Sequence, residues 1–268
     1  MKPITRLIYE SLTPQAYSFD VFFDIGANVG QTCRLAVEVF PEARVLSFEP
    51  VASTYATLVE NNKSLKRPVE TFDIAFGEEN GTVELFLKEL SVHHTLLPSR
   101  NKPLDRAGNA SEIIKVRRLS DFAAEQGIDF IDILKIDVEG YEIGVLKGGD
   151  SLLSGNVAFV IAECNFAIRD ERNTYFPKLE RYLTERGFEV VGLYDVVYRE
   201  RDGRLEYCDA VFVNPAAIKA KGKAHSSTPA SGLTWRSELL DLAREIEKPN
   251  AETTKLISKA LTLIAENS

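Results

Sequence analysis

Short, largely apolar runs alternate along this chain with stretches of helical periodicity. Runs of strand length stand at 21–23, 44–48, 69–72, 131–136 and 157–163. Runs that do not alternate strictly between apolar and polar residues suit strands buried on both faces, as in a parallel sheet. The succession of strands and helices therefore predicts an α/β fold with a doubly wound, mostly parallel sheet.

The last strands are predicted to differ from the others. Residues 188–193 and 210–213 are expected to form an antiparallel pair that ends the sheet, with a turn at 201–203 between them. A sheet of about seven strands with an antiparallel end follows from this pattern.

The stretch between the third and fourth strands is predicted to leave the central sheet. Asn80-Gly81 is typical of a hairpin turn and leads into a strand at 82–88, and 113–119 is predicted as another strand. Between them, residues 89–111 lack periodicity. We interpret this segment as a lid or acceptor-binding loop, with a surface insertion as the alternative.

Composition narrows the class of protein. The 268 residues carry a net charge of −8, which argues against a nucleic-acid surface with its basic stripes. No window has the apolar length of a membrane span, and the N-terminus lacks the apolar core of a signal peptide. Three widely spaced cysteines predict neither a disulfide framework nor a C-x-x-C metal site. We therefore expect a cytoplasmic protein with no membrane span and no nucleic-acid partner.

The most informative motif is VFFDIGANVGQ at 21–31. A strand followed by a glycine turn and a helix brings a nucleotide-like ligand close to backbone N–H groups. Asp24 precedes the glycines of the turn, Gly26 and Gly30, and Asn28 stands where a dinucleotide fingerprint has its second glycine. An acid at Asp24 suits a ligand with a cationic amino group, such as S-adenosylmethionine, better than a pyrophosphate. The alternative is a strand end with an ordinary glycine turn.

Acids follow three other predicted strands. Glu49 follows the second strand, where a carboxylate can accept hydrogen bonds from ribose hydroxyls. Asp73 follows the third, where it is expected to accept from an adenine amine while Ile74 packs on the ring. Asp137 follows the fourth. Because the carboxyl ends of parallel strands meet at one edge, Asp24 and these three acids predict a single crevice.

These motifs resemble the FkbM-type S-adenosylmethionine-dependent methyltransferases. The resemblance rests on FDIGANVGQ at 23–31, SFEP at 47–50, GEENGTVELF at 77–86 and LKIDVEGYEIGVLKGG at 134–149. It extends from about residue 19 to 214. It implies the seven-stranded class I methyltransferase fold, S-adenosylmethionine as donor and usually an oxygen acceptor.

A hydroxyl acceptor needs a group that takes its proton, either a base or a metal-bound ligand. The candidates are Asp137, Glu139 and His94. Glu139 is alternatively a residue that complements a helix dipole, and His94 acts only if its loop covers the site. Glu163 is expected either to join Asp137 at a Mg²⁺ site or to be a buried acid bonded to backbone N–H groups. The metal site is thus left open.

The chain is predicted to have three parts. The methyltransferase domain covers 1–215, a polar linker 216–232, and a C-terminal helical hairpin 233–268. The hairpin is expected to dock on the core, to form a homo-oligomer or to bind a partner. The predicted function is O-methylation of a small molecule or glycan. An NAD-linked oxidoreductase and a non-catalytic nucleotide-binding module are the alternatives.

Overall fold

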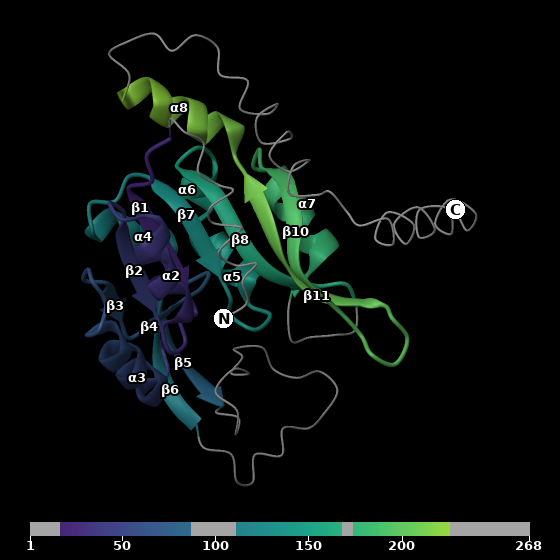
Figure 1. Ribbon diagram of the computed structural model, residues 1–268, viewed down its shortest axis with the longest axis horizontal. Helices are drawn as coiled ribbons and strands as arrows, with labels where there is room; N and C mark the ends of the chain where they lie inside the picture. The colour runs from purple at the N-terminus through teal and green to yellow at the C-terminus, as the bar shows by residue number, and fades with distance from the viewer. Residues whose placement is uncertain (1–16, 87–110, 168–173, 226–268) are drawn as a thin grey trace.

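The computed structural model describes residues 17–86, 111–167 and 174–225. Seven strands lie side by side in one sheet, and Figure 1 shows helices on both of its faces. In spatial order they are β10 (Glu189–Tyr198), β11 (Leu205–Val213), β8 (Val157–Asn165), β7 (Ile131–Ile136), β1 (Val21–Ile25), β2 (Arg44–Phe48) and β3 (Glu70–Phe72). An eighth short strand, β9 (Thr174–Tyr175), pairs with the end of β8.

Strand direction confirms the predicted fold class. β3, β2, β1, β7 and β8 are mutually parallel, whereas β11 runs antiparallel to both β8 and β10. This is an α/β sheet with an antiparallel end. The last strand pair is longer than its apolar pattern indicated, because β10 and β11 continue past the buried part of the sheet.

The helices bury both faces of the sheet. They are α2 (Gln31–Val39), α3 (Ala52–Asn62), α4 (Leu119–Glu125), α5 (Glu142–Gly148), α6 (Asp150–Leu153), α7 (Phe176–Thr184) and α8 (Pro215–His225). Phe22 and Phe23 of β1 are both buried but belong to different hydrophobic clusters. Phe22 packs with residues of α2, and Phe23 with residues of α4, α5 and α7. Adjacent strand residues point to opposite faces, so one strand supplies two cores.

A second, smaller sheet shows that the predicted hairpin at Asn80-Gly81 is wrong. Its order is β4 (Ile74–Phe76), β6 (Ser111–Arg117) and β5 (Gly81–Phe86), so β6 separates the strands on either side of Asn80-Gly81. Asn80 instead accepts a hydrogen bond from the Arg118 N–H at 2.8 Å, through Oδ1. Its amide group therefore fixes the approach to α4, a role that no dipeptide pattern predicts.

The segment predicted as a linker overlaps a helix. Residues 215–225 form α8, so the first part of the segment 216–232 is helical. A buried lysine of this helix, Lys221, reaches back to the start of the domain and donates to the Ser18 carbonyl at 2.8 Å. The remainder of the linker, the hairpin at 233–268 and most of the segment 89–111 lie outside the described residues. The division of the chain into domains stays a prediction.

All three cysteines are buried and free, as expected of small apolar side chains in these positions. Cys164 and Cys208 face each other across β8 and β11, with 3.6 Å between their Sγ atoms. Within the described ranges, no helix is long and apolar enough to cross a membrane.

Candidate active site

Three strand ends meet at the glycine turn. The N–H groups of Gly26 and Ala27 both donate to the Phe48 carbonyl at the end of β2, at 3.0 Å each. The Asp137 N–H donates to the Ile25 carbonyl at 3.0 Å. Gly26 has a φ of 78°, and a Cβ at this position would lie 1.8 Å from the Asp137 carbonyl oxygen. Glycine is required here because the turn packs directly on the loop that follows β7.

The Glu49 carboxylate accepts hydrogen bonds from two backbone N–H groups. Its Oε2 accepts from the Asn28 N–H at 3.1 Å and its Oε1 from the Val51 N–H at 3.0 Å. Asn28, with a φ of 48°, and Gly30, with a φ of 94°, complete the turn before α2. Burial raises the pKa of Glu49 to about 7, although the two N–H groups oppose the rise. Each carboxylate oxygen retains capacity for a second donor, as two ribose hydroxyls require.

Asp24 is fully buried at the end of β1. Within the described part of the chain, neither of its carboxylate oxygens has a hydrogen-bond partner of good geometry. The nearest cation, Lys135 Nζ, is 3.8 Å from Oδ1. Burial raises the pKa of Asp24 to about 6, and the neighbouring Asp137 adds to the rise while Lys135 and the Cys33 N–H oppose it. A buried acid with so little compensation is unusual and marks a site where a ligand can supply the missing charge.

Lys135 lies between Asp24 and Asp137 at the end of β7. Its Nζ lies 2.9 Å from Asp137 Oδ2, and its side chain is 12% exposed. Burial by itself lowers the pKa of Lys135, but the charges of Asp137 and Asp24 outweigh it and raise the pKa above its ordinary value. Lys135 is therefore a cation. Lys135 is not among the residues predicted from the motifs, although a lysine inside the apolar run 131–136 is the signal that identifies it.

The end of the third strand contacts the end of the second through its backbone. The Glu49 N–H donates to the Phe72 carbonyl at 3.1 Å, which places Asp73 one residue beyond that contact. The Asp73 carboxylate is paired at 3.0 Å with Lys115, and both side chains are more than half exposed. Ile74 is 9% exposed and packs in the core with Phe76. A role of Asp73 and Ile74 at an adenine ring stays a prediction.

The loop after β7 carries the remaining acids. Asp137 is 35% exposed, and Glu139 has a left-handed backbone with a φ of 53°. Helix α5 begins only at Glu142, so the acid in its first turn is Glu142 and not the predicted Glu139. Glu163 lies inside β8, two residues before the strand ends. His94 lies outside the described residues.

The described residues contain no cluster of three or more His, Cys, Asp or Glu side chains that could hold a metal ion. The structure thus brings together Asp24, Gly26, Asn28, Gly30, Glu49 and Asp137 at one edge of the sheet, with Asp73 beside them. It adds Lys135 and Glu142, which sequence patterns did not identify.

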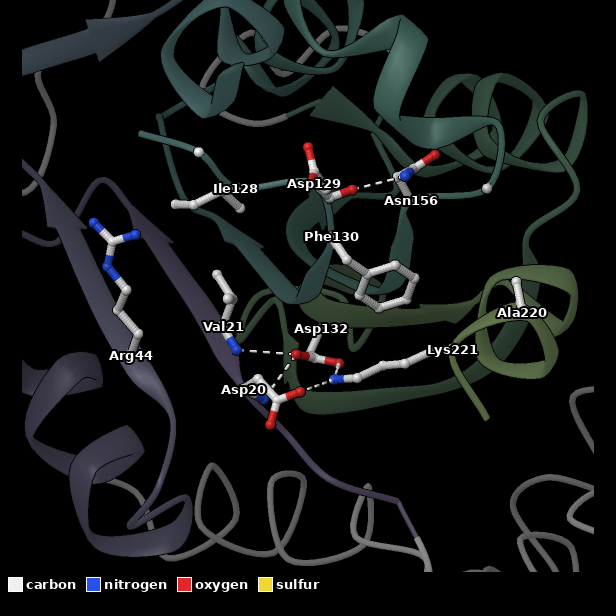
Figure 2. Close-up of a pocket in the computed structure, with 12 residues that line it drawn as sticks. Asp20, Val21, Arg44, Ile128, Asp129, Phe130, Asp132, Asn156, Ala220 and Lys221 are labelled. Carbon is white, nitrogen blue, oxygen red and sulfur yellow. Dashed lines mark hydrogen bonds and ion pairs between the residues drawn. The ribbon is translucent and has the colours of Figure 1, made fainter. Parts of the chain in front are cut away.

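A hollow of about 560 Å³ lies at the opposite edge of the sheet, where β1 and β7 begin. Figure 2 shows Asp132, Asp20 and Lys221 converging there beside Phe130. Asp132 Oδ2 accepts from the N–H groups of Asp20 and Val21 at 2.8 and 2.9 Å, and Oδ1 pairs with Lys221. These groups satisfy one another, whereas at the other end of β7 the Asp24 carboxylate has only the distant Lys135 cation.

Comparison with known proteins identifies the family. The model of the methyltransferase FkbM domain matches residues 24–190, which is more than half of the chain. The match begins at Asp24 and includes Glu49 and the whole loop after β7.

Three curated relatives are methyltransferases. The methyltransferase sdnD of Sordaria araneosa is 30% identical, and the alignment covers 62% of this chain and 73% of the relative. The 2-O-methyltransferase NoeI of Sinorhizobium fredii is 28% identical over 50% of this chain and 59% of its own. The 31-O-demethyl-FK506 methyltransferase FkbM of Streptomyces tacrolimicus is 30% identical over 54% of this chain and 65% of its own. The chain therefore belongs to the FkbM methyltransferase family and is an S-adenosylmethionine-dependent methyltransferase.

Proposed function

We propose that this methyltransferase acts on a hydroxyl oxygen of a small molecule or glycan. Two of the relatives are named for oxygen acceptors, one at a 2-O position and one at a 31-O position. The loop after β7, Asp137-Val138-Glu139-Gly140, is rich in carboxylates and lacks the N/D-P-P-Y turn usual in enzymes that methylate nitrogen. Carboxylates suit an acceptor that must lose a proton.

The observation that carries the donor site is the buried carboxylate of Asp24, which has no hydrogen-bond partner of good geometry among the described residues and only a distant cation, Lys135. When bound, S-adenosylmethionine supplies an electrophilic methyl group on a cationic sulfur and also carries an α-ammonium group. Asp24 and Glu49 provide negative charge for such a ligand, and a dinucleotide pyrophosphate would be repelled by the same charges. Glu49 would accept from the ribose hydroxyls while its bonds to Asn28 and Val51 hold it in place.

Asp137 is the proposed proton acceptor. Its carboxylate lies at the end of β7, is partly exposed and is held at 2.9 Å by Lys135. During transfer the acceptor oxygen forms a bond to the methyl carbon, the carbon–sulfur bond breaks, and the hydroxyl proton passes to Asp137. The Lys135 ammonium would stabilise negative charge that develops on the acceptor oxygen. Glu139 and His94 are the reserve candidates.

A role for Mg²⁺ beside Asp137 stays a prediction, as do a cytoplasmic location and a homo-oligomer formed through the C-terminal helices. A chelator separates the two roles of Asp137. If it is a metal ligand, EDTA abolishes turnover and Mg²⁺ restores it. If it is a carboxylate base, turnover is the same with and without EDTA.

Calorimetry with S-adenosylmethionine, S-adenosylhomocysteine and NAD tests the donor, followed by a screen of methyl glycosides, a hexuronic acid and a macrolide alcohol. We expect binding of the first two and a methyl ether product from one acceptor class. Binding of NAD alone would restore the oxidoreductase alternative. Donor binding with no transfer to any oxygen or nitrogen acceptor would favour a non-catalytic module.

A further inference from the structure

Glu142 is a fully buried carboxylate next to the loop that carries Asp137. Its Oε1 accepts from the N–H groups of Val138 and Gly140 at 3.3 and 3.1 Å. Its Oε2 accepts from the N–H and the hydroxyl of Thr174 at 3.2 and 2.5 Å. One side chain therefore joins two segments that are 32 residues apart, the loop after β7 and strand β9.

All four partners of Glu142 are donors, which restricts the side chain that can stand there. An ionised carboxylate is the side chain that accepts at every site and donates at none. Glutamine has the same shape, but its NH₂ group would face either the N–H groups of Val138 and Gly140 or the N–H group of Thr174, none of which can accept. Burial raises the pKa of Glu142, and the bonds from Thr174 and from the loop oppose that rise.

The loop depends on this carboxylate for its shape. Glu139 and Gly140 are both left-handed, with φ of 53° and 100°. Left-handed backbone is disfavoured for a non-glycine residue and persists where surrounding contacts impose it. The N–H groups on either side of Glu139 converge on one oxygen, as in a backbone nest that binds an anion. Glu142 supplies that anion.

On the basis of the proposed function, we propose that Glu142 is a positioning residue for methyl transfer. It fixes the loop 137–140, and with it the Asp137 carboxylate, against the segment that begins at Thr174. That segment pairs with the end of β8 and leads into α7. Glu142 contacts neither donor nor acceptor in this arrangement. Its effect passes through Asp137.

Asp132 is the matched control, because it is also a buried carboxylate with four donors. They are the N–H groups of Asp20 and Val21, the Tyr17 hydroxyl and the Lys221 ammonium. Asp132 lies at the other end of β7 and far from the reaction side. A purely structural role predicts the same consequences for both acids. A positioning role predicts a difference.

The experiment compares Glu142→Gln with Asp132→Asn in the full chain. Both variants should unfold at lower urea concentration than the wild type. Only Glu142→Gln should lower kcat, by tenfold or more, with KM and the Kd for S-adenosylmethionine changed less than threefold. Hydrogen exchange at the Val138 and Gly140 amides should rise at least tenfold in Glu142→Gln and stay unchanged in Asp132→Asn. An unaltered kcat and unaltered exchange in Glu142→Gln would overturn the proposal, as would equal loss of kcat in both variants.

Thr174 provides a second route if Glu142→Gln does not fold. Thr174→Val removes one donor and should lower kcat, whereas Thr174→Ser keeps the hydroxyl and should restore it. Equal activity of the two variants would contradict the positioning role. The hydrogen-exchange measurement needs neither the methyl donor nor the methyl acceptor. It therefore tests whether Glu142 fixes the loop 137–140 even if the proposed oxygen acceptor is wrong.

Discussion

The buried charged side chains at the two ends of β7 differ in how fully they are paired with groups of opposite charge and with hydrogen-bond donors. At the start of the strand, Asp132 receives four donors, and Lys221 contacts the Ser18 carbonyl, Asp20 and Asp132. At the end of the strand, Lys135 is shared between Asp137 and an Asp24 carboxylate that is 3.8 Å away. The protein satisfies its own charges at one end and leaves them partly unsatisfied at the other.

The difference indicates where binding free energy is available. A buried ion that is fully paired gains little from a ligand, because its desolvation is already offset by its partners. A buried acid without good hydrogen bonds gains a great deal from a cation. Both ends of β7 contain polar side chains. The incompletely paired set at the end of the strand, and not the hollow at its start, supports the proposed donor site.

Asp137→Asn should have the largest effect and would sharpen the contrast between the two ends. Loss of a general base lowers kcat by roughly 10²–10⁴-fold, while the donor should bind as in the wild type. Single-turnover assays and calorimetry measure the two quantities, with Glu60→Gln, at an exposed position of α3, as the control. Near-normal turnover by Asp137→Asn would make this acid structural and move the search to Glu139 and His94.

Lys221→Met tests the start of β7, where the buried charges are fully paired. Removing one partner of a buried ion pair leaves uncompensated charge and should lower the free energy of unfolding by roughly 3–5 kcal/mol. Lys219→Met, at an exposed position of the same helix, should change it by less than about 0.5 kcal/mol. Urea unfolding measures both. A donor affinity that falls with Lys221→Met in the folded state would break the comparison, because it would link the two ends.

Glu49→Ala tests the edge of the sheet where Asp24 is incompletely paired. Loss of hydrogen bonds to a charged acceptor should weaken S-adenosylmethionine binding by roughly 1.5–3 kcal/mol. Glu60→Ala, on the exposed side of α3, serves as the control for a lost negative charge. If calorimetry gives the same Kd for the wild type and Glu49→Ala, Glu49 does not contact the donor.

Donor affinity should also depend on pH. Asp24, with a pKa of about 6, and Glu49, with a pKa of about 7, are ionised at pH 8 and become protonated as the pH falls. Because a cationic donor favours the ionised acids, its affinity should fall by about tenfold between pH 8 and pH 6. In the ligand-free protein, the contribution of these two acids to the free energy of unfolding changes with pH in the opposite direction to donor affinity. Both pKa values are raised by folding, so these groups contribute less stability as the pH rises from 4.5 to 7.

Glu49→Gln should flatten part of the pH dependence of donor binding, since it removes one of the two titrating groups. Kd values measured at four pH values in one buffer system are sufficient. A wild-type Kd that is constant from pH 6 to pH 8 would show that neither acid changes its charge on binding.

Sequence patterns predicted the parts of the site that depend on neighbouring residues. The apolar run before Asp24, the glycine turn and the acids at the strand ends follow from local periodicity and from the geometry of a parallel sheet. The match of the FkbM model supports the resemblance read from the same motifs.

The rest of the site depends on contacts that periodicity does not contain. The polar composition of 216–232 predicted a linker, but residues 215–225 form a helix, and its Lys221 pairs with Asp132, which is 89 residues away. Glu142 stands in an apolar pattern, and the donors that accommodate an acid there include Thr174, which is 32 residues away in the sequence. Asn80 likewise acts through the backbone of Arg118, which is 38 residues away.

The close packing at Gly26 also has a mechanical consequence. The Asp137 carbonyl occupies the space that a methyl group at residue 26 would need. The glycine turn and the loop after β7 are therefore in direct van der Waals contact. Tightly packed interiors transmit displacement instead of absorbing it. An inward shift of residues 24–30 would therefore displace the segment that carries Asp137, the proposed proton acceptor, so donor binding at the glycine turn is expected to affect the proposed acceptor side by steric contact.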